Sequence, residues 1–199
     1  MNLNLLIAVA AGYLLGSLSF AVITSRLMGL ADPRSYGSGN PGATNVLRSG
    51  NKRAALLTLV FDALKGYLPV LACALLGWGE AVAATAGLAA FVGHLWPVFF
   101  RFQGGKGVAT AAGVVFGLNP ILGLAVLASF ALVLGFTRYV SLASMVAAVF
   151  AAFYQALIWG LSPAVGVLAA MALLLVLRHR ANIERLLAGT ESKLGAKKA

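Results

Sequence analysis

Long uninterrupted runs of apolar residues, separated by short polar segments, dominate the pattern along this 199-residue chain. A helix needs about 20 apolar residues to cross the hydrocarbon of a bilayer. Three runs of suitable length occupy residues 3–25, 54–76 and 81–100. Two longer charge-free stretches follow at residues 107–137 and 139–177, which as single helices would extend about 46 Å and about 59 Å. Each is too long for one crossing, so we expect each to contain two.

Turn signals divide both long stretches. Asn119-Pro120 lies inside the first stretch, and Pro163 ends a turn inside the second. The first division leaves an apolar helix at residues 108–118 that is only about 17 Å long. Such a helix must be shielded by its neighbours or form a re-entrant segment inside the bundle. The pattern therefore predicts an all-α integral membrane protein with seven transmembrane helices, one of them short.

Basic residues mark one side of this predicted bundle. All but one of the 15 Lys and Arg residues lie in four places, residues 26–53, residues 101–106, Arg138 and residues 178–199. The exception is Lys65, inside a predicted span. Cytoplasmic loops of membrane proteins are enriched in Lys and Arg. We therefore expect the N-terminus outside and the C-terminus in the cytoplasm.

Composition supports a membrane protein and excludes other classes. Apolar residues make up 61% of the chain and charged residues 10%, whereas soluble domains carry about 25% charged residues. The net charge of +10 follows from the topology, and without a soluble basic module no nucleic acid is expected as a partner. No basic residue precedes the first apolar run, which we interpret as a retained span. We expect one domain, residues 1–199, with a flexible tail from about residue 192.

Metal and disulfide chemistry have no support in the sequence. The two histidines are far apart, and no carboxylate cluster accompanies them, so no metal site is expected. Cys73 is the single cysteine and lies in an apolar run. We expect it to be a packed thiol.

The first candidate site is the glycine-rich loop at residues 32–48. Glycines let backbone amides approach a ligand closely, and successive amides form an anion-binding nest. Arg48 adds a guanidinium that can grip a phosphate with two hydrogen bonds. The alternative is a plain polar linker. The neutral polar side chains of the loop are Ser38, Asn40, Thr44 and Asn45.

The second candidate is a glycine-rich loop that runs into the predicted short helix. Its residues are Gly104, Gly105, Lys106, Gly107 and, in the helix, Thr110. A helix N-terminus with free amides and a lysine is suited to binding phosphate. Gly107 stands where a Walker A loop needs Ser or Thr, which argues against a magnesium nucleotide. The alternative is a simple turn with a lysine that orients the chain.

The third candidate lies where the last span leaves the membrane. His179 and Asn182 are three residues apart and would share a face of a helix. The neighbouring arginines alone would be a stop-transfer cluster. Ser141 begins another span on the same predicted side of the membrane. A pairing of His179 with Glu184 is a weak alternative signal.

Three polar residues inside predicted spans remain. Asp62 and Lys65 are three residues apart and can pair along their helix, or serve a site, because an unpaired charge in a membrane is costly. His94 either bonds within the bundle or belongs to a site.

Together these segments resemble the bacterial PlsY family. The resemblance rests on three motifs in the order of the chain, Gly37 to Arg48, Gly93 to Thr110, and His179 to Glu191. It covers nearly the whole sequence. It implies a seven-helix membrane enzyme with a cytoplasmic site, in the inner membrane of a bacterium. No cofactor is implied.

The resemblance also implies a reaction. The family transfers an acyl group from acyl phosphate to the 1-hydroxyl of sn-glycerol 3-phosphate, and lysophosphatidate and phosphate are the products. Each substrate carries a phosphate, so two anion sites are needed, and we expect the first loop to bind glycerol 3-phosphate and the second loop the acyl phosphate. The residues expected to act in catalysis are Lys106, Ser141, His179 and Asn182.

A rival function is transport of phosphate or an organophosphate. Transporters usually show internal repeats and place their sites near the midplane of the membrane. Here no repeat is visible, and the polar loops gather on one face. The partners expected are therefore the two substrates and membrane lipid, with the oligomeric state left open.

Overall fold

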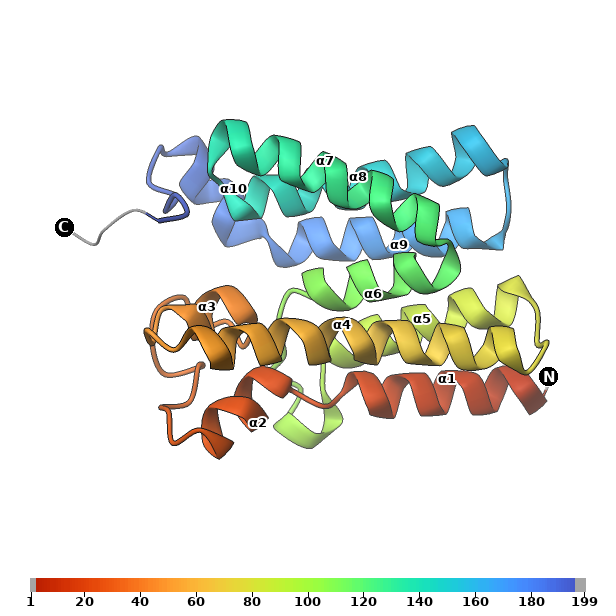
Figure 1. Ribbon diagram of the computed structural model, residues 1–199, viewed down its shortest axis with the longest axis horizontal. Helices are drawn as coiled ribbons and strands as arrows, with labels where there is room; N and C mark the ends of the chain where they lie inside the picture. Colours follow the sequence, from red (N-terminus) through yellow and green to blue (C-terminus); the bar gives the residue numbers. More distant parts are fainter. Residues whose placement is uncertain (1–2, 196–199) are drawn as a thin grey trace. The chain divides into compact units, whose positions relative to one another are not determined.

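A computed structural model describes residues 3–195 of the protein, and this part of the chain is helical without strands. Figure 1 shows long helices joined by short turns. Their bounds are α1 Leu3–Gly16, α2 Phe20–Leu27, α3 Ala43–Leu47, α4 Lys52–Leu75, α5 Glu80–Leu95, a 3₁₀ turn Val98–Phe100, α6 Val108–Leu118, α7 Pro120–Thr137, α8 Val140–Trp159, α9 Pro163–Arg178 and α10 Arg180–Leu187.

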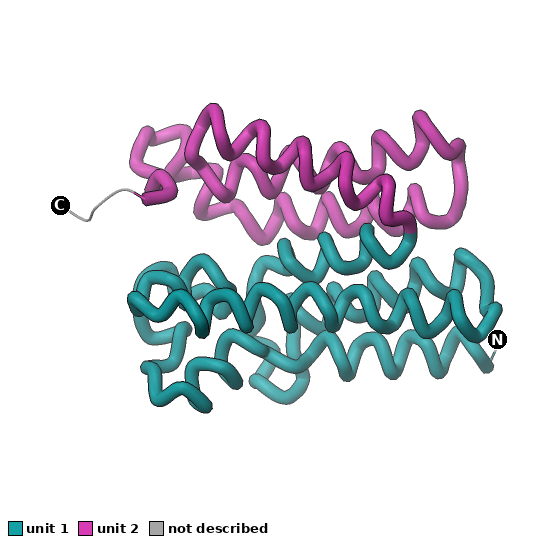
Figure 2. Tube along the Cα trace, viewed as in Figure 1, with its two compact units in different colours: residues 1–118 teal, residues 119–199 magenta. Residues whose placement is uncertain are grey.

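The chain forms two compact units, residues 1–118 and residues 119–199, which Figure 2 draws in separate colours. A single domain over residues 1–199 stays a prediction. The expected flexible tail begins inside the described residues but ends outside them, at residues 196–199.

Small residues let the helices of the first unit pack closely. A side chain at Gly16 of α1 would collide with the Ala90 carbonyl of α5, and one at Gly113 of α6 would collide with the Ala63 carbonyl of α4. Interfaces of small residues are typical of membrane helices, where close backbone approach replaces the hydrophobic effect. Glycine is therefore needed at both positions.

The first predicted span, residues 3–25, is bent. α1 and α2 meet at 41° around a break at Ser17–Ser19. The break leaves the Leu18 carbonyl without a helical partner, and Lys65 Nζ of α4 donates to it at 2.7 Å. A charged side chain therefore stabilises the bend.

Turn residues end the helices of the second unit where the sequence predicts. The Asn119 side chain accepts hydrogen bonds from the first amides of α7, and Pro120 takes the first helical position. Arg138 ends α7 in a left-handed conformation, and Gly160 with φ 83° follows α8. α7, α8 and α9 then pack in sequence against one another.

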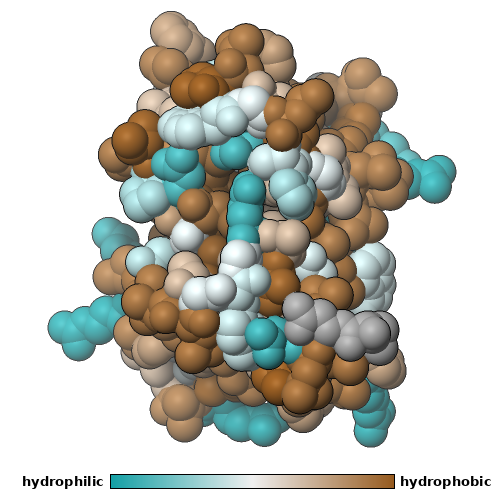
Figure 3. All heavy atoms as spheres, turned by 90° about the vertical axis from the view of Figure 1, so that its right-hand side faces the viewer, coloured by the Kyte–Doolittle hydropathy of each residue, from teal (hydrophilic) through white to brown (hydrophobic). Residues whose placement is uncertain are grey.

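The helices have the length and surface of membrane spans. Four of them, α4, α5 with its 3₁₀ turn, α7 and α8, are long and apolar enough to cross a bilayer, and two bent pairs raise the number to as many as six. Large apolar side chains such as Phe136 (89% exposed) and Leu124 (60%) point outward. Figure 3 shows hydrophobic residues over much of the visible surface. The chain is an all-helical integral membrane protein.

A count of seven spans depends on α6, which has 11 residues. That count, and the orientation in the membrane, stay predictions.

Candidate active site

Asn45 lies at the centre of the first loop, which folds around its buried side chain. The residue is only 2% exposed. Its amide Nδ2 donates to the Pro33 carbonyl at 2.6 Å and to the Tyr36 carbonyl at 3.1 Å. Its Oδ1 accepts from the backbone amide of Ser38 at 3.0 Å. Asn45 thus fixes the path of the loop up to Ser38.

Arg48 lies beside this amide, directly after α3. Its Nη1 is 3.5 Å from Asn45 Oδ1. Gly37 has φ 61°, and a side chain there would collide with Asn45 and lie 3.3 Å from Arg48 Nη1. Glycine is required at this position for both conformation and space. The structure therefore brings Ser38, Asn45 and Arg48 together, as the sequence predicts. The remaining polar residues expected in the loop are Asn40, half-buried, and Thr44, exposed.

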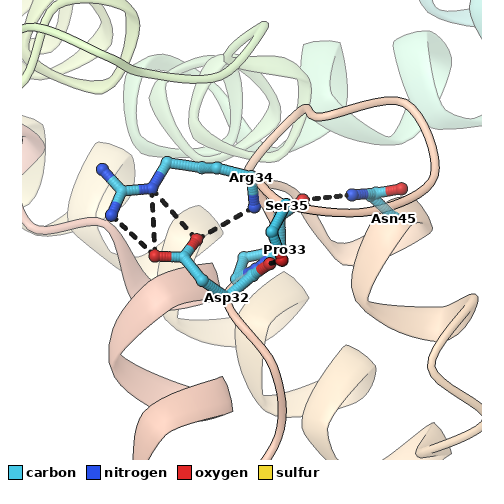
Figure 4. Close-up of polar contacts among 5 residues, drawn as sticks. All are labelled: Asp32, Pro33, Arg34, Ser35 and Asn45. Carbon is cyan, nitrogen blue, oxygen red and sulfur yellow. Dashed lines mark hydrogen bonds and ion pairs between the residues drawn. The ribbon is translucent and has the colours of Figure 1, made fainter.

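A second arginine in the loop is already paired. Figure 4 shows the Arg34 guanidinium against the Asp32 carboxylate, with the amide of Asn45 nearby. Arg34 Nη2 donates to Asp32 Oδ2 at 2.6 Å, and Arg34 Nε donates to Asp32 Oδ1 at 3.0 Å. The hydrogen bond from Arg34 holds the pKa of the Asp32 carboxyl below its ordinary value. Because its charge is neutralised locally, Arg34 is less suited than Arg48 to bind a phosphate.

The glycine loop consists of Gly104, Gly105, Lys106 and Gly107. It passes directly over the C-terminal end of α5, where the Gly105 amide donates to the His94 carbonyl at 3.1 Å. A side chain at Gly104 would collide with the same carbonyl. Gly107 has φ 79°, and a side chain there would collide with Phe91. Three glycines are thus needed for the loop to lie this close to the helix.

The glycine loop and the first loop meet at one end of the first unit. A Cβ on Gly105 would lie 3.1 Å from the Pro41 carbonyl. Lys106 is half-buried next to this contact, and α6 begins at Val108 with its amides at the same place. The two glycine-rich loops, one carrying Arg48 and the other Lys106, are therefore neighbours.

In the second unit a carboxylate gathers the third candidate residues. Glu191 Oε1 accepts from Ser141 Oγ at 2.7 Å and from Asn182 Nδ2 at 2.6 Å. Glu191 Oε2 accepts from Arg185 Nε at 2.7 Å. Ser141 and Asn182 are each 6% exposed. The structure thus brings these two predicted residues together through a third.

Sequence reasoning assigned no role to Glu191, although it lies in the third motif. Burial alone would raise the pKa of its carboxyl, but the hydrogen bonds from Ser141, Asn182 and Arg185 outweigh that effect and lower the pKa below its ordinary value. The one local signal was an acidic residue in a segment otherwise rich in arginine.

His179 lies at the bend of 59° between α9 and α10, where it caps both helices. The expectation that it shares a continuous helix face with Asn182 is therefore wrong. It is 2% exposed, and its Nδ1 lies 2.8 Å from the Leu175 carbonyl. Glu184 pairs with Arg180 on the surface, at 3.2 Å.

The segment after α10 returns to the junction of α7 and α8. Leu194 donates its amide to the Arg138 carbonyl at 2.8 Å, and Arg138 Nη2 donates to the Leu194 carbonyl at 2.8 Å. Residues 192–195, expected in a flexible tail, are thus attached by hydrogen bonds.

Comparison with known proteins identifies the family. The family profile described as glycerol-3-phosphate acyltransferase matches residues 6–189. A glycerol-3-phosphate acyltransferase of Ralstonia nicotianae is 59% identical over 94% of this chain and 93% of its own. One of Burkholderia pseudomallei is 57% identical over 98% of both chains.

Two solved structures share the fold. Both are crystal structures of PlsY, an integral membrane glycerol 3-phosphate acyltransferase. The glycerol 3-phosphate form has a TM-score of 0.91 at 40% identity and covers 96% of both chains. The lysophosphatidic acid form has a TM-score of 0.89 at 39% identity, over 96% of this chain and 95% of that one.

The fold and the loops thus define a membrane-embedded acyltransferase. The chain belongs to the glycerol-3-phosphate acyltransferase family, the PlsY family. This membership favours an enzyme of phospholipid synthesis over the transporter that the sequence left as a rival.

Proposed function

We propose that this protein transfers a fatty acyl group from acyl phosphate to the 1-hydroxyl of sn-glycerol 3-phosphate, giving lysophosphatidate and inorganic phosphate. The observation that carries the proposal is the contact between two glycine-rich loops of the first unit, one of which carries Arg48 and the other Lys106. Both substrates carry a phosphate, so the reaction needs two neighbouring anion sites. The solved relatives in glycerol 3-phosphate and lysophosphatidic acid forms support this choice of acceptor and product.

The first loop is proposed to hold glycerol 3-phosphate. Arg48 and the Ser38 hydroxyl would bind its phosphate, because a guanidinium and a hydroxyl are strong donors to phosphate oxygens. Asn45 keeps Ser38 and Arg48 in place through the hydrogen bonds described above. Asn40 and Thr44 are proposed to complete the loop around the ligand.

The glycine loop is proposed to hold the acyl phosphate. Lys106 and the amides of Gly104, Gly105 and Gly107 would bind its phosphate and stabilise the negative charge that develops during transfer. Thr110, which the sequence groups with this loop, is buried on the first turn of α6, and its hydroxyl lies 3.1 Å from His94 Nδ1. For Ser141, His179 and Asn182 we propose the role of orienting the glycerol end of the acceptor.

The chemistry needs no strong protein base. The 1-hydroxyl oxygen attacks the acyl carbonyl carbon, a carbon–oxygen ester bond forms, and the carbon–oxygen bond to phosphate breaks. The leaving phosphate accepts the hydroxyl proton and departs as inorganic phosphate. Holding both substrates in line then supplies much of the rate. We place the enzyme in the inner membrane of a bacterium, with this site facing the cytoplasm, because both loops of the site lie in basic segments of the sequence.

One assay tests the proposal. Purified protein in detergent is given synthetic acyl phosphate and glycerol 3-phosphate, and lysophosphatidate and phosphate are measured together. We expect the two products in equal amounts, and no product when acyl-CoA replaces acyl phosphate. Lysophosphatidate formed from acyl-CoA alone would overturn the proposed donor.

A further inference from the structure

Four buried polar side chains form a cluster inside the first unit. Asp62 and Lys65 of α4, His94 of α5 and Thr110 of α6 are each 7% exposed or less. Lys65 Nζ lies 2.7 Å from Asp62 Oδ1. His94 Nδ1 lies 3.1 Å from Thr110 Oγ1 and 3.7 Å from Asp62 Oδ1. Three helices therefore contribute to one buried polar cluster.

His94 joins this cluster to the glycine loop. Its carbonyl accepts the Gly105 amide. Its ring presents Nε2 to the other side of the same glycine, where a side chain would collide with that nitrogen. The imidazole is thus packed between the cluster at Nδ1 and the glycine loop at Nε2. Its orientation depends on what holds Nδ1.

Stability alone does not explain the charged members of the cluster. Replacing a buried ion pair by apolar residues of similar volume is often neutral or stabilising. Ionisable residues inside membrane spans usually serve a function for the same reason. Lys65 pairs with Asp62 and also donates to the Leu18 carbonyl. Of the two charged side chains, Asp62 is the one that lies next to the His94 ring.

We propose that Asp62 is a positioning residue, which together with Thr110 orients the His94 ring and so sets the glycine loop for binding the donor phosphate. The 3.7 Å separation is too long for a hydrogen bond, so Asp62 acts on the ring by charge, and Thr110 acts by its hydrogen bond. This inference rests on the proposed function, because it takes the glycine loop as the donor site.

The test compares a charge-free double variant with a matched control. Asp62→Asn combined with Lys65→Met removes both charges and leaves no unpaired one. Thr110→Val removes only the hydrogen bond to His94. The control is Thr58→Val, since Thr58 is equally buried in α4 but its hydroxyl bonds only to the Ala54 carbonyl of its own helix.

We expect the double variant to fold but to unfold somewhat below the wild-type temperature, because the Leu18 carbonyl loses its Lys65 donor. The KM for acyl phosphate should rise about tenfold or more, and the KM for glycerol 3-phosphate should stay within about twofold. Thr110→Val should likewise raise the KM for acyl phosphate more than the KM for glycerol 3-phosphate. Thr58→Val should change neither constant. Wild-type donor KM in the double variant, or an equal rise of both constants, would overturn the proposal. If the double variant does not fold, Asp62→Asn alone takes its place under the same criterion, because Lys65 then keeps its hydrogen bond to the Leu18 carbonyl.

A binding measurement separates this inference from the proposed function. Inorganic phosphate is titrated calorimetrically into protein carrying Arg48→Ala, which weakens the first loop, with and without the double substitution. Weaker phosphate binding in the double variant supports the inference, and equal binding overturns it. Absence of lysophosphatidate from the wild type would reject the proposed function, while this comparison would still decide the role of Asp62.

Discussion

At the scale of single residues, a few buried groups determine the position of exposed ones. Asn45 is buried and holds the amide of Ser38, while Ser38 and Arg48 themselves are exposed to solvent. In the second unit Glu191 instead holds two buried side chains, Ser141 and Asn182. Substitution of an exposed residue such as Arg48 should weaken substrate binding, whereas substitution of a residue with a buried side chain, such as Glu191, should lower the stability of the fold.

Arg48→Ala should raise the KM for glycerol 3-phosphate about 10- to 100-fold, with a smaller effect on kcat, because a charge-assisted contact to the bound substrate is lost. Steady-state kinetics in detergent measure this change. The matched control is Arg34→Ala in the same loop, whose guanidinium is occupied by Asp32, and it should leave KM within about threefold. An unchanged KM for Arg48→Ala would remove Arg48 from the acceptor site.

Glu191→Ala should lower the free energy of unfolding by about 2–4 kcal/mol, because Ser141 and Asn182 would lose their buried acceptor. Thermal unfolding in detergent micelles measures it. The control is Glu184→Ala, whose exposed pair with Arg180 should contribute less than about 0.5 kcal/mol. Equal losses in the two variants would contradict a special role for Glu191.

The same carboxylate predicts a dependence on pH. Its pKa is lowered in the folded protein from the ordinary value of 4.5, so the unfolded chain binds more protons at this group as the pH falls. The stability that the Glu191 carboxylate contributes is therefore complete at pH values above the ordinary pKa. It is lost as the pH falls from the ordinary pKa to the lowered pKa of the folded protein. Unfolding temperatures measured from about pH 6 down to about pH 3 should fall more steeply for the wild type than for Glu191→Gln. Parallel profiles would contradict the shift.

At the scale of helices, the packing around two glycines predicts that a Gly→Ala substitution lowers stability at one position and raises it at the other. Gly113→Ala should destabilise the protein by about 1–3 kcal/mol, because the new Cβ would collide with the Ala63 carbonyl of α4. Gly135→Ala in α7 meets no neighbouring atom and should stabilise by up to about 1 kcal/mol through helix propensity. Thermal unfolding of both variants checks the signs, and two losses of equal size would contradict the packing.

Most helices could be predicted from the sequence because their ends have local causes. Asn119-Pro120 and Pro163 interrupt apolar runs with residues that start helices, and the structure begins α7 and α9 at those prolines. The break between α1 and α2 has no such signal, because no proline or charge interrupts the run, and the partner that stabilises it, Lys65, comes from another helix. The sequence likewise gives no local signal for α3 and α10 as separate short helices.

The candidate site was predictable to the same extent. Glycines next to basic residues indicated the first loop and the glycine loop, and the structure brings the two loops into contact. Tertiary contacts were not visible in the sequence. Glu191 meets Ser141 from 50 residues away, and His94 lies under Gly105 because α5 ends beneath the glycine loop.

At the scale of the whole molecule, the distribution of basic residues predicts the orientation in the membrane. In a Cys73→Ala background, a membrane-impermeant thiol reagent applied to intact cells should label the Glu80→Cys variant and not the Ser49→Cys variant, since only the loop around Ser49 is basic. Both positions are exposed, so permeabilised cells should show labelling of both. The reverse pattern would invert the predicted topology.

The pairing of Asp62 with Lys65 also bears on how the protein is made. A lone charge at the centre of a helix costs about 2.5–3.5 kcal/mol when the translocon passes the helix into the bilayer. In α4 the two opposite charges lie three residues apart on one helix, so they can neutralise each other before α5 and His94 have left the ribosome. Loss of either charge alone would therefore first impair the insertion of α4 during synthesis, so that the helix enters the membrane late or in the wrong place.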